Sequence, residues 1–325
     1  AKAARKAAHR LRTKGVEVTV TPSEGVRGPG ADTEVDAPPS LISQYDGRGQ
    51  RIVWLAQTET RGLLLHRARL SWRGGLLELK TGMTSRSEFR RVLRDLEQRE
   101  LLTARCDETA ASWLLSASAK LTKARGRGLP EGYLLASRLL KGNRDAPHPG
   151  LDQAPSDGDV LALFERPEAL LGWMPDEETA QGIGARLQEI AMSPILLDAA
   201  QRKAQALEAL QQAAKEYFQK QDQRDGSRAF LLDMVQLYAL RGDAATAGTL
   251  RTAAGLFETE DVGEHPFAQR FFERFFDLDK VAAGPEAALH DHHHHHDHDG
   301  PCDHPDHHHG EADSETGGKG GLVLP

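Results

Sequence analysis

The sequence is poor in cysteine and in aromatic residues, and it contains no long uncharged apolar segment. Its only two cysteines, Cys106 and Cys302, cannot provide a disulfide framework for 325 residues. Aromatic residues make up 6% of the chain and charged residues 27%, which favours a helical protein based on Leu and Ala over an aromatic-rich β-sandwich. No apolar run approaches the roughly 20 residues that span a bilayer, so we expect neither a transmembrane segment nor a membrane partner.

Signals for secretion and for common catalytic sites are also missing. The first residues alternate Ala with Lys and Arg and lack the apolar region of a secretory signal, so we expect a cytoplasmic protein. The chain has no phosphate-binding loop of the form GxxxxGK[ST], no HExxH motif and no CxxC motif. Gly182 and Gly184 lack the third glycine of a dinucleotide fingerprint, because Leu187 takes its place. These absences favour a non-enzymatic function and leave one alternative, an enzyme whose site is assembled from distant residues.

Charge is divided unevenly along the chain. Residues 1–150 contain 27 Lys and Arg against 16 Asp and Glu, a net charge of +11. Residues 151–325 contain 14 against 32, a net charge of −18. A basic half can bind phosphate backbones or acidic proteins, and it can equally be neutralised by the acidic half of its own chain.

Stretches rich in Pro and Gly divide the chain into segments. We predict a basic helix at 1–20, a linker at 21–50, a β-β-β-α unit with further helices at 51–141, a second linker at 142–158, a helical domain at 159–281 and a disordered tail at 282–325. The predicted fold class is therefore α+β, mostly α, with a helical bundle or repeat-like region after the sheet.

The clearest local pattern is a small three-stranded antiparallel meander covered by a helix. Alternating apolar residues between short turn sequences predict its strands at 51–58, 63–72 and 76–81. Ser85 and Glu88 then form a capping-box pattern. The apolar stripe that follows at helical spacing consists of Phe89, Val92, Leu93 and Leu96. A meander needs a cover over its apolar face, so we expect this helix to pack there.

The rest of the body has the periodicity of helices. We predict them near 108–124, 130–141, 175–192, 194–220, 227–241, 244–258 and 266–278. Tyr238, the turn at 241–243, Ala247 and Ala254 resemble a single tetratricopeptide-type hairpin, in which small residues permit close helix packing. Because such arrays need about three repeats, an ordinary hairpin in a bundle is the alternative. Either form offers a surface for a protein partner of unknown identity.

The most distinctive segment is a histidine cluster near the end of the sequence. Imidazole is the commonest protein ligand for zinc, nickel and copper, and Asp and Cys add oxygen and sulfur donors. The predicted metal ligands are His290, His292, His293, His294, His295, His296, His298, Cys302, His304, His307, His308 and His309. Five consecutive histidines cannot all face one ion in a fixed geometry, so we expect several exchanging sites that buffer or deliver zinc or nickel. Free imidazole titrates at about pH 6.5, so affinity should fall on acidification.

In composition, residues 290–309 resemble the histidine-rich tails of bacterial nickel-handling proteins. These families are the hydrogenase accessory GTPases, the urease accessory metallochaperones and prolyl isomerases of the FK506-binding class. The resemblance implies metal ligation by the tail histidines and nothing further, because the rest of the chain departs from all three families. An expression tag or an inert repeat has a similar composition, but interleaved Asp residues, a second cluster and the 16 residues that follow it argue against a tag.

Arginines of the predicted β-β-β-α unit indicate a second function. The candidate nucleic-acid-binding residues lie on one predicted helix and are Arg86, Arg90, Arg91 and Arg94. The preceding strands contribute Arg67, Arg69 and Arg73. If these side chains converge, they can bind phosphates while Trp54 or Trp72 stacks on bases. A solvated basic face is the alternative.

The sequence thus predicts a non-enzymatic cytoplasmic interaction protein whose His/Asp-rich tail binds zinc or nickel as its only cofactor. A nucleic-acid- or ribosome-associated factor that uses the basic half is the second hypothesis.

Overall fold

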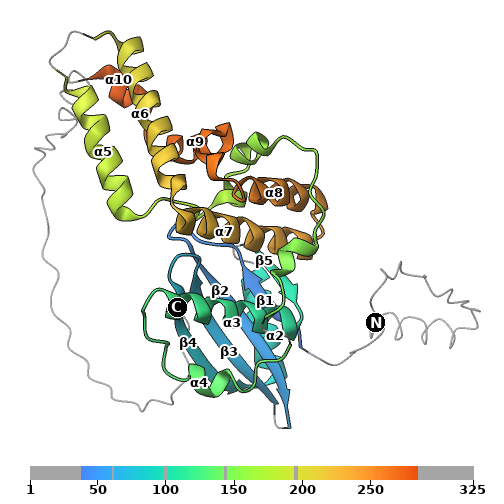
Figure 1. Cartoon of the computed structure of the whole chain (residues 1–325). Coiled ribbons are helices and arrows are strands. Elements are labelled where there is room, and N and C mark those ends of the chain that lie inside the picture. Colours follow the sequence, from blue (N-terminus) through green and yellow to red (C-terminus); the bar gives the residue numbers. More distant parts are fainter. Residues whose placement is uncertain (1–37, 61, 98–101, 143–144, 194–196, 285–325) are drawn as a thin grey trace, which may run out of the picture.

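The computed structural model describes residues 38–60, 62–97, 102–142, 145–193 and 197–284. Within these ranges an antiparallel sheet has helices on both faces, and a helical region packs against one end of it (Figure 1). The fold is α+β with more helix than strand, as predicted. The basic helix expected at 1–20 and the tail beyond Gly284 lie outside the described residues.

The sheet has five strands, not the three that were predicted. They are β1 Ser40–Ser43, β2 Gln50–Glu59, β3 Gly62–Ser71, β4 Gly75–Thr84 and β5 Thr103–Cys106, and their order is β4-β3-β2-β1-β5. β1 lies in the segment predicted as a linker, and β5 lies between two predicted helices. Each has four residues, too few to show alternation in the sequence, and β1 is held by pairing with β2 on one side and with β5 on the other.

α2 (Arg86–Glu97) covers one face of the sheet, as the sequence predicted. Its buried stripe of Phe89, Leu93 and Leu96 packs against an apolar patch that includes Trp54. The predicted capping box forms as well. The Ser85 hydroxyl accepts the N–H of Glu88 at 3.1 Å, and the Glu88 carboxylate accepts the N–H of Ser85 at 2.9 Å.

α3 (Glu108–Ala124) covers the opposite face and begins at Asp107, whose carboxylate accepts the N–H of Ala110. It approaches β4 so closely that a Cβ on Gly75 would lie 2.3 Å from the Ser118 carbonyl oxygen. Gly75 also has a positive φ of 76°, so both space and backbone conformation require glycine there. The next helix, α4 (Tyr133–Ala136), is much shorter than the helix predicted at 130–141.

The helical region begins inside the second predicted linker at 142–158, because its first element, η1 (Pro149–Asp152), lies there. Its further elements are η2 Val160–Glu165, η3 Pro167–Leu170, α5 Glu177–Ala191, α6 Ala199–Gln219, α7 Gln221–Leu240, α8 Ala244–Leu256, η4 Glu260–Glu264, α9 Pro266–Glu273 and α10 Leu278–Ala283. Its core contains fully buried Trp173, whose ring lies 4.5 Å from that of Phe271 and 5.3 Å from that of Phe267. None of the described helices is both long and apolar enough to cross a bilayer.

α7 and α8 form the helical hairpin that the sequence predicted, although α7 begins six residues earlier than expected. Gly242 in the connecting turn has a φ of 81°, a conformation that favours glycine. Ala247 and Ala254 on α8 are fully buried, which is consistent with close packing of the two helices. α7 also contacts the sheet unit, so this hairpin connects the helical region to the sheet.

Candidate functional site

The predicted metal ligands between His290 and His309 all lie outside the described residues. Within the part of the chain that the structure describes, no group of three or more His, Cys, Asp and Glu side chains could hold a metal ion. The buried histidines of the body make hydrogen bonds to protein groups instead. The metal hypothesis therefore depends on the tail alone.

His66 on β3 is fully buried and bonded at both ring nitrogens. Nδ1 lies 2.8 Å from the Thr81 hydroxyl, and Nε2 lies 3.1 Å from the side-chain oxygen of Gln57. Burial lowers the pKa of His66, an effect that the charge of Glu108 opposes. An imidazole that is buried on the α3 side of the sheet and hydrogen-bonded at both ring nitrogens has a structural role.

A buried polar cluster joins the sheet to α7. Asp233 on α7 accepts a hydrogen bond from Arg51 Nη2 on β2 at 2.6 Å and another from the Tyr45 hydroxyl, which follows β1. His148 Nε2 lies 3.1 Å from the same carboxylate. Because His148 Nδ1 accepts the N–H of Gly150, Nε2 is the nitrogen that donates to Asp233. Three chain segments far apart in sequence thus share one carboxylate.

The charges of this cluster compensate one another in the interior. Burial on its own raises the pKa of Asp233, but Arg51, His148 and Tyr45 outweigh it, and the pKa falls to about 2. Burial raises the pKa of Tyr45 well above its ordinary value. At neutral pH the cluster therefore contains a carboxylate, a guanidinium and a neutral phenol. Each group already has a protein partner, so the arrangement holds the two parts of the fold together.

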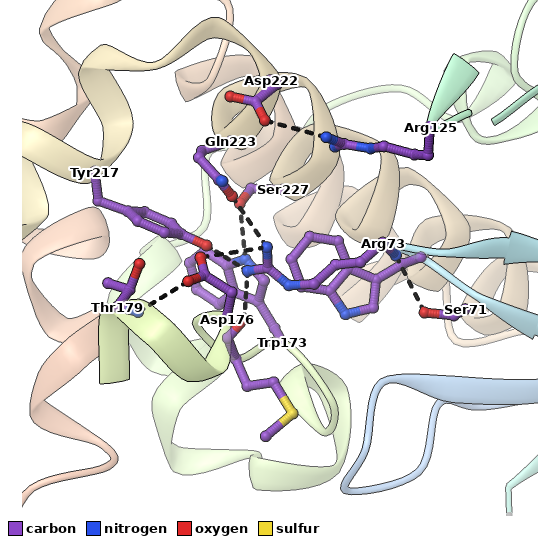
Figure 2. A network of polar contacts seen from close by, with 12 residues as sticks. Ser71, Arg73, Arg125, Trp173, Asp176, Thr179, Tyr217, Asp222, Gln223 and Ser227 are labelled. Atoms are coloured by element: carbon purple, nitrogen blue, oxygen red, sulfur yellow. Dashed lines mark hydrogen bonds and ion pairs between the residues drawn. The ribbon is translucent and has the colours of Figure 1, made fainter. Parts of the chain in front are cut away.

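Arg73, predicted to join a basic surface, instead points into the junction between the sheet and the helical region (Figure 2). Its Nη2 donates to the Met174 carbonyl at 2.7 Å and to the Tyr217 hydroxyl, and Nη1 donates to Gln223 at 3.1 Å. The guanidinium also lies over the ring of Trp72, 4.1 Å from its centroid. Arg73 is therefore a structural residue and not part of the exposed basic surface.

The four predicted nucleic-acid-binding arginines, Arg86, Arg90, Arg91 and Arg94, are all exposed on α2. Strand register places further cations on the same side of the sheet as α2. Arg67 pairs with Trp54 on β2 and with Lys80 on β4, and Trp54 packs under α2. Because side chains alternate between the two faces along a strand, Arg69 on β3 lies on the α2 side as well. Arg105 on β5 also lies there, because it pairs with Leu41 of β1, which packs under α2. We name these eight residues the basic face: Arg67, Arg69, Lys80, Arg86, Arg90, Arg91, Arg94 and Arg105.

Carboxylates on the basic face are few. Glu78 on β4 lies 2.9 Å from Lys80 and 3.5 Å from Arg69, and these contacts lower its pKa, with the Lys80 hydrogen bond as the largest cause. Glu88 and Asp95 are exposed on α2 itself. Among the side chains that the structure describes, eight cations against these three carboxylates make this part of the face positive, and long exposed side chains there can reach phosphate or carboxylate groups.

The two tryptophans expected to stack on bases cannot do so. Trp54 is buried beneath α2, and Trp72 is buried against the helical region, where its Nε1 donates to the Gly172 carbonyl at 2.8 Å. Both are 5% exposed, which leaves no ring face for a ligand. The basic face can therefore bind a polyanion through charge, without the aromatic stacking that specific single-strand recognition uses.

Two adjoining hollows of about 690 and 360 Å³ lie between α5 and α6 and share Arg186 and Ala209. Acidic, basic and apolar side chains all line the hollows, for example Glu208, Lys215 and Ile190. The hollows are open along the helices, so they form a shallow groove on the surface. Such a groove can hold an extended or helical segment of another molecule more readily than it can enclose a small substrate.

No protein-family model, no curated protein and no solved structure matches this chain. Its function therefore has to be inferred from its own residues and their arrangement.

Sequence reasoning missed the Asp233 cluster, although one signal was present. Asp233 interrupts the apolar run at 230–237, and a carboxylate at a core position of a helix needs a charged or hydrogen-bonding partner. Its partners Arg51 and Tyr45 lie more than 180 residues away, so their identity could not be read from local spacing.

Proposed function

We propose that this chain is a non-enzymatic interaction protein whose His/Asp-rich tail binds zinc or nickel. The observation that carries the proposal is the density of ligands in 290–309, where eleven histidines and one cysteine occur within 20 residues. Neutral imidazoles with interleaved carboxylates suit borderline divalent ions. Their number and spacing favour several weak, exchanging sites over one closed site.

The arrangement of the body supports an interaction function. Its most strongly coupled ionisable groups, Asp233 and Arg51, are used to join the sheet to the helical region. Its described hollows form an open groove, and its charges gather on an exposed face. An open groove and an exposed charged face are properties of a binding surface. Metal binding is assigned to the tail alone.

Isothermal titration with zinc or nickel tests the tail. The matched variant should end at Gly284, because an earlier end would remove part of α10, in which Ala282 is buried and its carbonyl accepts a hydrogen bond from Arg202. We expect the full chain to bind several ions at about pH 7.5, where imidazole is neutral, and to lose this binding at about pH 5. The variant should bind none.

A second variant separates imidazole from carboxylate ligation. Replacing the eleven tail histidines by Gln keeps every Asp, and we expect it to lose zinc and nickel binding as completely as the truncation. Equal metal binding by the full chain and by the variant ending at Gly284 would refute the proposal.

A second candidate function is binding of a nucleic-acid backbone by the basic face. It is favoured by the placement of Arg67, Arg69 and Lys80 on the same side of the sheet as α2. Because binding would release condensed counterions, affinity for RNA or DNA should fall steeply as salt rises. Sequence preference should be weak, since no tryptophan of the body is exposed to stack on bases.

Charge reversal on α2 tests this candidate. The triple variant R86E, R90E and R94E should lose most RNA and DNA retention in a salt-series filter-binding assay. The control variant R186E and K220E reverses two exposed cations of the helical region and should bind as the parent does. Unchanged retention by the α2 variant would eliminate the candidate.

A further inference from the structure

We infer that the acidic tail of this chain docks on its own basic face, and that zinc binding at the tail histidines releases it. The proposal assigns one occupant, residues 290–315, to a surface that the described part of the structure leaves exposed. Docking requires only the tail carboxylates and the cations of the face. Release by zinc additionally rests on the metal binding proposed above.

The cations of the basic face lie on three neighbouring parts of the fold: the strand pair β3–β4, the helix α2 and the edge strand β5. Arg67 and Lys80 pair across β3 and β4, and Arg69 lies two residues further along β3. Arg90, Arg91 and Arg94 extend the positive surface onto exposed turns of α2, and Arg105 adds to it on the edge strand β5. Within the described residues, the carboxylates beside these cations are Glu78 from β4 together with Glu88 and Asp95 from α2. A ligand with many spaced carboxylates matches this surface.

The tail has the complementary charge. Residues 285–325 contain nine Asp and Glu and one Lys, a net charge of −8 when the histidines are neutral. Eight of the nine carboxylates fall between Asp291 and Glu315. Because the tail and the basic face belong to one chain, the effective concentration of the tail at the face is about millimolar. Even weak attraction between their charges therefore populates the docked state.

The tail is also long enough. Cys302 lies eighteen positions beyond Gly284, and an extended chain of that length reaches about 60 Å. A folded domain of about 240 residues has a radius of gyration of about 18 Å, so any face lies within reach. Geometry therefore imposes no barrier between the end of α10 and α2.

The same histidines make the charge of the tail reversible. Each zinc ion held by neutral imidazoles adds two positive charges, so about four ions cancel the tail charge of −8.

A nitroxide label on Cys302 can detect docking in the full-length chain. Cys106 is buried and burial raises its pKa to about 12, so a thiol-directed label at neutral pH is selective for Cys302. The measurement is the broadening of backbone amide signals relative to the same sample with a reduced label. Amides of α2 and β4 report on the basic face, and amides of α8 serve as the internal reference.

We expect broadening confined to α2, β4 and neighbouring strands at low salt and about pH 7.5. It should be lost in about 1 M salt, where the screening length is about 3 Å. It should also be lost on addition of zinc, which is diamagnetic and does not itself broaden signals. The variant R90E and R94E should abolish it, whereas the control R186E and K220E should leave it unchanged.

A tail variant distinguishes carboxylates from histidines. Replacing Asp291, Asp297, Asp299, Asp303 and Asp306 by Asn leaves every histidine, and it should abolish broadening while zinc still binds in a calorimeter. Broadening that is absent at low salt, or that survives R90E and R94E, would overturn docking. If docking occurs but calorimetry detects no zinc, the proposed metal function fails and docking stands. Broadening that persists at saturating zinc would overturn zinc release.

Discussion

The carboxylate of Asp233 on α7 lies 2.6 Å from the guanidinium of Arg51 on β2, and both side chains are almost completely buried. Tyr45 and His148 donate to the same carboxylate, so strands, loop and helix meet at one group. Two Arg51 nitrogens, Nε and Nη1, have no protein partner among the described residues. Asp233 is therefore the main compensation for the Arg51 charge, and the junction between sheet and helices depends on this pair.

Replacing Asp233 by Asn should destabilise the protein by about 3–5 kcal/mol, because it leaves the buried Arg51 charge uncompensated. Denaturant unfolding followed by circular dichroism measures this change. Asp279→Asn is the matched control, since Asp279 also lies 2.6 Å from a cation, Lys203, but is 83% exposed. The control should lose less than about 1 kcal/mol. Similar losses in the two variants would contradict the role assigned to burial.

The Asp233 cluster also predicts a loss of stability in acid. The pKa of Asp233 is lowered to about 2 in the folded state, whereas an unfolded Asp titrates at about 3.9. This difference contributes about 3 kcal/mol above about pH 4, and the contribution is lost as the pH falls toward 2. Unfolding free energies measured across this range should fall more steeply for the parent than for Asp233→Asn. Parallel curves would show that Asp233 does not titrate as proposed.

Arg73 should tolerate no conservative replacement. Its planar guanidinium bonds the Met174 carbonyl, Gln223 and Tyr217 together, and one ammonium cannot reproduce that geometry. We expect Arg73→Lys to lower the free energy of unfolding by about 2 kcal/mol. Arg69→Lys, on an exposed part of β3, should change it by less than about 0.5 kcal/mol. Urea midpoints at constant slope provide the comparison.

Gly172 should be intolerant of a side chain for two separable reasons. Its φ is 83°, and a Cβ would lie 2.5 Å from the Asp46 carbonyl oxygen and 2.9 Å from the Gly49 Cα. Gly126 has a similar φ of 68° but open space around it. We expect Gly126→Ala to cost about 1 kcal/mol from backbone strain alone and Gly172→Ala to cost about 3 kcal/mol or more. Equal melting temperatures of the two variants would exclude the steric argument.

Cys106 should be unreactive in the folded protein. It is 6% exposed at the end of β5, and burial raises its pKa to about 12, so very little thiolate exists at neutral pH. In the variant Cys302→Ser, a thiol reagent should therefore modify nothing until denaturant is added. Rapid modification under native conditions would contradict the burial of this side chain and would remove the basis for selective labelling at Cys302.

Sequence reasoning succeeded where the signal is local. The α2 stripe with its capping box and the α7–α8 hairpin each follow from periodicity within 30 residues, and both form. It failed for β1 and β5, because four-residue strands show no alternation and depend on pairing with each other. The predicted helix at 130–141 reduces to α4, because beyond it Leu140 is buried in the core beside the sheet and the Leu139 carbonyl accepts a hydrogen bond from Gln57.

By itself, the sequence determined the helix patterns of α2 and the α7–α8 hairpin, the opposite charges of the two halves and the concentration of His and Asp in the tail, since periodicity and composition are local properties. Tertiary structure alone decided which arginines are exposed. Arg67 and Arg73 are six residues apart on one hairpin, yet register places Arg67 on the α2 side of the sheet, and the junction draws Arg73 inward to Met174 and Tyr217. The sequence contains both residues, but only long-range packing places one on the α2 side of the sheet and the other in the junction with the helical region.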